Sequence, residues 1–74
     1  MEIKRLSEKK PTLDEAKEFV GGWVAMVTLD NGDQLLCDED GGLKRLKTNE
    51  EATEIVGQRI VGNVMILSGK ARWD

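Results

Sequence analysis

Carboxylates are the only plentiful side chains in this 74-residue chain that could act as acids, bases or metal ligands. The chain contains 14 Asp and Glu residues but no His and a single Cys. Two turns predicted at the ends of residues 34–38 hold a group of these acids. Acids at opposite ends of one strand are not expected to share a metal ion, so we interpret them as solvated turn residues. The group consists of Asp30, Asp33, Asp38, Glu39 and Asp40.

The residue types present do not indicate a catalytic or metal site. A calcium loop beginning at Asp38 would place Gly42 where a ligand is needed and Leu43 where glycine is required. Without His, a Cys/His zinc site and a serine nucleophile both lack their partners. Cys37 cannot form an internal disulfide, and its position in a predicted strand favours a small buried side chain. We expect no enzyme activity, no metal and no cofactor, and a lone Cys fits a reducing cytoplasm.

Basic residues near residue 45 and near the C-terminus are the candidates for partner binding. Lys44, Arg45 and Lys47 form one local patch, and Arg72 precedes Trp73 in the other. A net charge of −3 argues mildly against binding to a polyanion, and few aromatic rings are available for base stacking. A protein partner is therefore favoured over nucleic acid. The candidate partner-binding residues are Arg45, Lys47, Arg72 and Trp73.

Two roles for Trp73 remain open. It could fold back over an open sheet edge, or it could contact a partner, because tryptophan is enriched at interface hot spots. Trp23, by contrast, follows two glycines and begins an apolar run. We expect Trp23 to be buried between a helix and the sheet, where its indole N–H needs an acceptor.

Capping signals predict two helices. Thr12 and Glu15 have the spacing of a capping box, and Gly21-Gly22 ends that helix. The second helix begins at Thr48 or Asn49 and ends at Gly57. Gly21-Gly22 does not indicate a phosphate-binding loop, because such a loop follows a strand and precedes a helix.

Apolar runs and turns predict the strands. Residues 23–29 are mostly apolar on both faces, which is typical of a central strand. Asn31-Gly32 predicts a hairpin to a strand at 34–38, and a Gly41-Gly42 turn leads to a third strand at 43–47. Residues 60–67 form one long strand or two short ones, with a bulge or bend at Gly62-Asn63. Residues 2–6 are expected to form a short edge strand.

These elements give the order βαβββαβ. The order predicts an α+β domain with a small, mostly antiparallel sheet of four to five strands and two helices on at least one of its faces. Residues 1–74 form one domain, with a compact core at about 12–67 and a polar tail at 68–74. No segment approaches the ~20 apolar residues of a membrane span, and the N-terminus does not look like a signal peptide. An open sheet edge would permit a homodimer.

The order and spacing of four stretches resemble a family of small domains of unknown function from bacteriophages, plasmids and some bacteria. The stretches are Phe-Val-Gly-Gly-Trp at 19–23, Asp-Glu-Asp-Gly-Gly-Leu at 38–43, Thr-Asn-Glu-Glu-Ala at 48–52 and Ile-Val-Gly-Asn-Val at 60–64. Acidic residues at 50 and 51 stand where the family often has basic ones, so the resemblance implies no role for positive charge there. The motif positions, interpreted as structural, are Gly21, Gly22, Trp23, Asn49, Ala52 and Gly62.

The resemblance implies a phage or mobile-element origin and a compact fold, and it implies no activity. We expect a non-enzymatic, phage-encoded accessory protein in the host cytoplasm that binds a host or phage protein, through its sheet face or its tail, in host takeover or regulation. The alternative is a module that binds or sequesters a small ligand or nucleotide, with amides at Gly21-Gly22 or at Asn49 holding an anion. Nucleic-acid binding is a weaker alternative.

Overall fold

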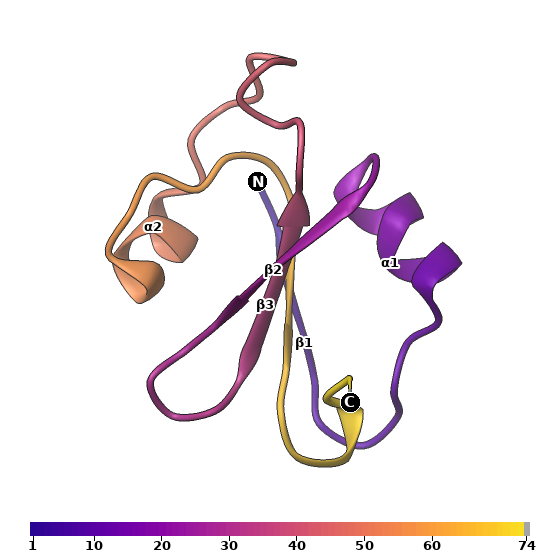
Figure 1. Ribbon diagram of the computed structural model, residues 1–74. Coiled ribbons are helices and arrows are strands. Elements are labelled where there is room, and N and C mark those ends of the chain that lie inside the picture. The colour runs from indigo at the N-terminus through magenta and orange to yellow at the C-terminus, as the bar shows by residue number, and fades with distance from the viewer. Residues whose placement is uncertain (74) are drawn as a thin grey trace.

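The computed structural model describes residues 1–73, and Asp74 lies outside the described residues. Four strands form one sheet in the order β1-β4-β3-β2, with antiparallel β2/β3 and β3/β4 pairs and a parallel β1/β4 pair. Two helices flank the sheet (Figure 1), so the predicted α+β class with a small, mostly antiparallel sheet is confirmed. In chain order the elements are β1 (Ile3–Leu6), α1 (Leu13–Val20), β2 (Val24–Thr28), β3 (Gln34–Asp38), α2 (Glu50–Val56), β4 (Val64–Leu67) and the 3-10 helix η1 (Gly69–Ala71).

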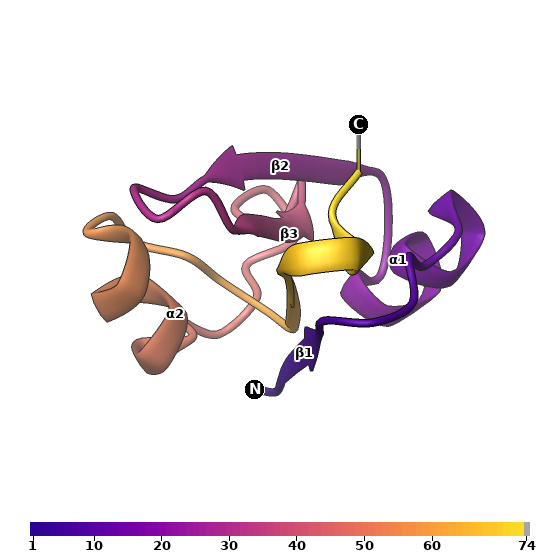
Figure 2. The same ribbon diagram turned by 90° about the horizontal axis from the view of Figure 1, so that it is seen from below.

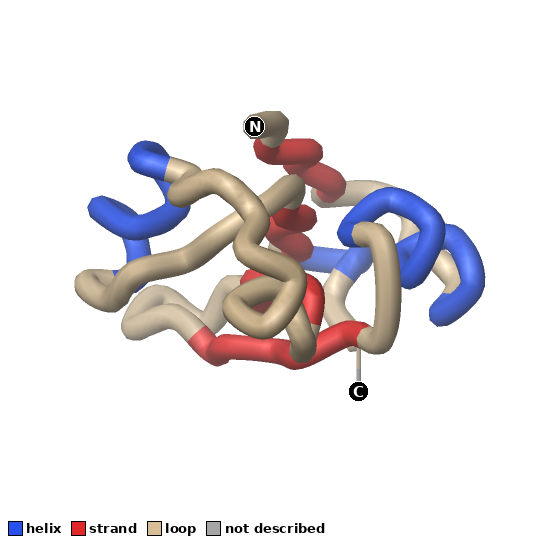
Figure 3. The backbone as a smooth tube through the Cα atoms, turned by 90° about the horizontal axis from the view of Figure 1, so that it is seen from above, coloured by secondary structure: helices blue, strands red, loops and turns tan. Residues whose placement is uncertain are grey.

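The two helices cover opposite faces of the sheet, as the views along the strands show (Figures 2 and 3). Each face therefore has its own hydrophobic core. The core under α1 consists of Ala16, Leu36, Met65, Leu67 and Ala71. The core under α2 consists of Leu35, Ala52, Ile60, Val64 and Ile66. Ala71 is fully buried although it belongs to the segment expected to be a polar tail.

The apolar segment at 23–29 is not the central strand that its composition predicts. Its regular part, β2, lies at one edge of the sheet, and the central positions belong to β3 and β4. All four residues of β4 are buried, whereas Met26 in the middle of β2 is exposed. Both faces of β4 are therefore buried, as its apolar composition indicates, whereas β2 is also mostly apolar in composition but partly exposed.

The strand predicted at 43–47 does not form. The amide of Lys44 donates to the carbonyl of Asp40 at 3.0 Å, so the chain coils back on itself instead of extending. Arg45 has a φ of 57°, in the left-handed region that interrupts a strand. The spacing of Leu43 and Leu46, three residues apart, fits these consecutive turns better than the two-residue repeat of a strand.

Residues 60–67 do not form one long strand, and the regular strand is β4 alone. Residues 60–63 are not part of β4, because Gly62 adopts a φ of 79° and turns the chain there. Val61 instead forms an isolated antiparallel bridge with Thr48. Residues on either side of the bend therefore have different partners. Val61 pairs with Thr48, just before α2, and residues 64–67 form β4.

The predicted helix starts and stops are confirmed. Thr12 and Glu15 form the reciprocal capping box at α1, and Gly21 closes that helix in the left-handed conformation. At α2 the cap is Asn49 rather than Thr48, and Gly57 ends the helix in the same way. These capping bonds join residues three or four positions apart, so the sequence alone can predict them.

The predicted hairpin between β2 and β3 is also confirmed, with a three-residue turn. Leu29 donates its amide to the carbonyl of Asp33 at 2.8 Å, and Gly32 alone in the turn has positive φ. The Asn31 side chain accepts from the Asp33 amide at 3.0 Å. Within residues 1–73 no helix is both long enough and apolar enough to cross a membrane.

Candidate functional site

The loop that follows β3 is held by an ion pair with one buried partner. Asp38 has a side chain only 1% exposed, and its Oδ2 atom lies 2.7 Å from Nζ of Lys44. Its Oδ1 atom accepts from the amide of Asp40 at 2.9 Å. The Lys44 ammonium also donates to the carbonyl of Gly21 at 2.9 Å, and so connects the loop to the end of α1. The interpretation of Asp38 as a solvated turn acid is therefore wrong, because Lys44 folds over it.

These contacts keep Asp38 ionised. Burial by itself raises the pKa of a carboxyl group. The hydrogen bonds from Lys44 and from the Asp40 amide, together with the charge of Lys44, outweigh the burial and hold the pKa of Asp38 below its ordinary value. The carboxylate of Asp38 is therefore ionised at neutral pH.

Close packing fixes the rest of the loop against residues 60–62. A β-carbon placed on Gly41 would lie 2.7 Å from a methyl group of Val61. A β-carbon on Gly62 would lie 2.8 Å from a methyl group of Leu46. A side chain at either position would have to displace one of these methyl groups, so the two glycines let the loop pack closely on the segment before β4.

Leu43 projects from this fixed loop and is 85% exposed. The same loop carries Arg45 and Lys47, both exposed. Arg59 approaches from the neighbouring segment, where its Nε atom donates to the Thr48 hydroxyl at 3.0 Å. We call Leu43, Arg45, Lys47 and Arg59 the loop surface.

The loop surface lies beside a small depression of about 230 Å³ lined by both Gly42 and Arg59. Lys44, although basic, is engaged with Asp38. Sequence reasoning identified Arg45 and Lys47 but placed Leu43 in a strand. An isolated leucine between two glycines and two basic residues was the signal for an exposed loop tip.

The other two predicted partner-binding residues lie elsewhere. Arg72 donates to the carbonyl of Gly32 at 3.3 Å. The indole N–H of Trp73 donates to the carbonyl of Pro11 at 3.0 Å, and the Trp73 backbone makes two hydrogen bonds of 2.6 Å with the side-chain amide of Gln34. The 3-10 helix η1, which precedes Arg72, and the 39–47 loop lie at opposite ends of the sheet (Figure 1). The structure therefore does not bring the two predicted basic groups together.

Trp73 folds back onto the protein. Its ring packs against the core under α1. Trp23, which was expected to be buried, is instead 60% exposed. The Lys17 ammonium lies 3.9 Å from the centre of the Trp23 ring, a cation–π contact.

Asn49 and its neighbours account for three of the structural motif positions. The Asn49 side chain is buried, accepts from the amide of Ala52 at 3.1 Å and donates to the carbonyl of Gly62 at 2.9 Å. Ala52 is fully buried against the sheet. One side chain thus starts α2 and fastens the bend before β4.

The helix ends considered for anion binding make internal contacts instead. Gly21 offers its carbonyl to Lys44, at the C-terminal end of α1, where the helix dipole disfavours an anion. The amides of Gly21 and Gly22 both donate to the carbonyl of Lys17, at 2.8 and 3.0 Å. Glu50 and Glu51 occupy the first turn of α2. Neither glycine nor Asn49 presents an open anion site.

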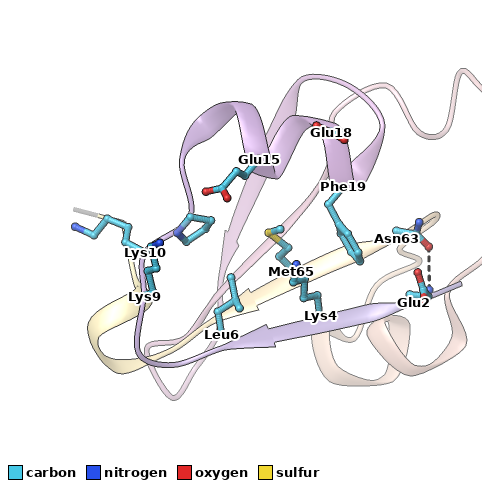
Figure 4. A pocket seen from close by; sticks show the side chains of 11 residues that line it. Glu2, Lys4, Leu6, Lys9, Lys10, Glu15, Glu18, Phe19, Asn63 and Met65 are labelled. Atoms are coloured by element: carbon cyan, nitrogen blue, oxygen red, sulfur yellow. Dashed lines mark hydrogen bonds between the residues drawn. The ribbon is translucent and has the colours of Figure 1, made fainter.

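A wide groove separates β1 from α1 (Figure 4). Its volume is about 590 Å³. Lys4 points across it toward Phe19, with 5.7 Å between the ammonium and the ring centre. Glu15 is engaged with the amide of Thr12, and the hydrogen bonds from Thr12 lower the pKa of the Glu15 carboxyl. The lining residues are Glu2, Lys4, Leu6, Lys9, Lys10, Pro11, Glu15, Glu18, Phe19, Asn63 and Met65.

Cys37 packs partly buried against the core under α2. Burial raises the pKa of its thiol, and the negative charge of Asp38 raises it further. The thiolate form is therefore scarce at neutral pH. Across residues 1–73 no cluster of three or more His, Cys, Asp or Glu side chains is arranged to hold a metal ion.

The chain belongs to the family described as "Domain of unknown function (DUF3846)", whose model matches residues 1–73. The resemblance to a family of small domains of unknown function is thereby confirmed. No curated protein and no solved structure shows significant similarity to this chain.

Proposed function

We propose that this member of the DUF3846 family is a protein-binding module that engages its partner through the loop surface. The observation that supports the proposal most directly is Leu43, which is 85% exposed on a loop held by the ion pair between buried Asp38 and Lys44. A mobile loop would lose conformational freedom on binding, at about 1–2 kcal/mol per backbone residue. A loop already ordered before binding avoids most of that loss.

The charges of the loop indicate the chemistry of the partner. The part of the loop that follows Leu43 carries Arg45 and Lys47, and Arg59 lies beside it. Arginine is enriched at protein interfaces and pairs with carboxylates in bidentate geometry. We infer a partner with an apolar pocket for Leu43 next to an acidic patch.

The wider biological role is part of the same proposal. We infer a non-enzymatic accessory protein, encoded by a phage or mobile element, that acts in the host cytoplasm on a host or phage protein in host takeover or regulation. The absence of His from the sequence and the family resemblance support this role. The genes that flank the coding sequence in its source genome test the proposed origin.

Affinity capture from host lysate with matched variants tests the loop surface. Wild type and the control variant Leu13→Ser should retain the same partner, because Leu13 is an exposed leucine on α1, away from the loop. Leu43→Ser and the double variant Arg45→Glu, Lys47→Glu should lose it. Equal capture by all four proteins would contradict the proposal. A captured complex that nuclease treatment dissolves would indicate nucleic acid as the partner.

The groove between β1 and α1 supports a second candidate function, the binding of a small anionic ligand such as a nucleotide. Its volume could hold such a ligand, with Phe19 as a stacking surface and Lys4 as a cation. A thermal-shift screen with nucleotides tests this candidate. Stabilisation that disappears in a Lys4→Gln, Lys9→Gln variant would support it, and no stabilisation by any nucleotide would exclude that ligand class.

A further inference from the structure

Of the three asparagines in the sequence, only Asn31 is followed by glycine. The main-chain nitrogen of the residue after an asparagine can attack the side-chain carbonyl carbon, which makes asparagine a thermolabile residue. Gly32 has no β-carbon to hinder this attack. Asn31 is also exposed, whereas Asn49 is buried and Asn63 precedes Val64, which is fully buried in β4. The Asn31-Gly32 pair is therefore the asparagine position at which this attack is least hindered.

The reaction is a deamidation, and it involves no oxidation or reduction. The nitrogen of Gly32 forms a bond to Cγ of Asn31, and the bond from Cγ to Nδ2 breaks. Nδ2 leaves as ammonia, with the proton that the Gly32 amide has lost. Water then opens the resulting five-membered succinimide ring at one of its two carbonyls. One opening gives aspartate, and the other gives isoaspartate, in which the main chain is longer by one methylene group.

The closed turn keeps the two reacting groups apart. Gly32 donates its amide to the carbonyl of Leu29 at 2.9 Å. Neither Asp30 nor Asn31 has positive φ, so residues 29–32 form a type I turn. The ψ of Asn31 is then about 0°, which places the Gly32 nitrogen beside the Asn31 main-chain nitrogen. Ring closure requires a different ψ, because the Gly32 nitrogen and the Asn31 β-carbon must lie on the same side of the Cα–C bond.

Hydrogen bonds also hold the reacting atoms themselves. Oδ1 of Asn31 accepts from the amide of Asp33 at 3.0 Å, and Nδ2 of Asn31 donates to Oδ2 of Asp33 at 3.1 Å. The amide proton of Gly32, which must leave during the attack, is engaged with the Leu29 carbonyl. Arg72 donates to the Gly32 carbonyl at 3.3 Å, so a distant segment also lies against the turn. The attack therefore requires the turn to open.

We propose that Asn31 is a site of spontaneous deamidation, which the closed turn between β2 and β3 blocks and which local opening of that turn exposes. Exposed turns open at a lower free energy than core strands, so this opening does not require global unfolding. The change is permanent, because the ammonia is lost. In the isoaspartate product the lengthened main chain no longer matches the bonds that close the turn.

Peptide mapping by mass spectrometry measures deamidation at each asparagine, at mildly alkaline pH, in native buffer and in concentrated guanidinium chloride. Asn31 should react about tenfold or more faster in the unfolded chain than in the folded one. In guanidinium chloride, where folding plays no part, Gly32→Ala should slow the reaction because its β-carbon hinders the attack. Equal rates in folded and unfolded wild type would overturn the protection. Faster reaction at Asn49 or Asn63 in the unfolded chain would overturn the choice of site.

Two matched variants in native buffer separate opening of the turn from global unfolding. Asp33→Ala removes the acceptor of Nδ2 but keeps Asn31 and Gly32, and it should deamidate severalfold faster than wild type. Asp40→Ala removes an exposed carboxylate from the 39–47 loop and should deamidate at the wild-type rate. Faster deamidation of Asp33→Ala with a folded circular dichroism spectrum would support the proposal. Equal rates in the two variants would show that the side-chain bonds of the turn do not protect Asn31.

The isoaspartate product tests the consequence for the hairpin. Chromatography after incubation in guanidinium chloride separates this product, which is then returned to native buffer. Its thermal unfolding midpoint should be lower than that of wild type and of Asn31→Asp, because Asn31→Asp gains the same charge without a longer main chain. An isoaspartate form as stable as Asn31→Asp would show that the turn accommodates the additional methylene group and would overturn this consequence.

Discussion

The Nζ atom of Lys44 lies 2.7 Å from Oδ2 of Asp38, six residues earlier in the chain. Only the carboxylate is buried, while the lysine side chain remains 42% exposed. The pair therefore combines a desolvated anion with a partly solvated cation. Its consequence is the fixed loop that displays Leu43.

Replacing Asp38 with Asn should lower the free energy of unfolding by about 1–3 kcal/mol at pH 7, because a charge-assisted hydrogen bond is lost and Lys44 can still be solvated. The pKa of Asp38 is lower in the folded protein than its ordinary value of 3.8. Its contribution is therefore complete above about pH 4–5 and is lost as the pH falls through the folded-state pKa.

Urea denaturation at pH 7 and at pH 3 measures this effect. The difference between wild type and Asp38→Asn should shrink at the lower pH. Asp40→Asn removes an exposed carboxylate from the same loop and should have little effect at either pH. A difference that stays constant between the two pH values would show that ionisation of Asp38 does not stabilise the fold.

Asn49→Ala should destabilise the protein more than Thr12→Ala. Both residues cap a helix, and loss of a cap alone lowers the free energy of unfolding by about 1 kcal/mol. Asn49 is buried and also donates to the carbonyl of Gly62, which would be left unsatisfied, so we expect a loss of about 2–4 kcal/mol. Thermal and urea unfolding of the two variants provide the comparison. Equal losses would mean that the Asn49–Gly62 bond contributes nothing measurable.

Gly62→Ala and Gly57→Ala separate backbone strain from crowding. Both glycines have positive φ, 79° and 85°, so alanine is strained at either position by about 1 kcal/mol. A β-carbon at residue 57 meets open space, whereas at residue 62 it lies 2.8 Å from Leu46. Gly62→Ala should therefore be the more destabilising by about 1–3 kcal/mol in urea denaturation. A matching loss in both variants would show that Leu46 moves freely aside.

The two tryptophans should differ in fluorescence quenching. Trp73→Phe leaves Trp23, which is exposed, and Trp23→Phe leaves Trp73, which is packed against the core under α1. Acrylamide is neutral, so Lys17 beside Trp23 does not bias the comparison. The Trp73→Phe protein should show the larger quenching constant. The opposite order would mean that Trp73 does not fold back in solution.

Local interactions explain why the helices and the hairpin could be predicted from the sequence. The Thr12–Glu15 box, the Asn49 cap and the Asn31-Gly32 turn each depend on residues at most four positions apart. The order of the strands has no such local source. β1 pairs with β4 through residues about 60 positions apart, and this pairing moves β2 to the edge.

The residues of the candidate site also divide into those that could be predicted from the sequence and those that could not. The exposed cations Arg45 and Lys47 were identifiable from composition, because a charged side chain in a turn is generally solvated. Three other features depend on tertiary contacts and could not be predicted. Lys44 folds over Asp38 and buries it, Leu43 is exposed, and Trp73 packs inward with a hydrogen bond to Pro11. The sequence by itself determined where the two helices and the turn between β2 and β3 begin and end. Only the tertiary structure decided which strand lies at the edge and which side chains face solvent, because burial is set by long-range packing and not by residue type.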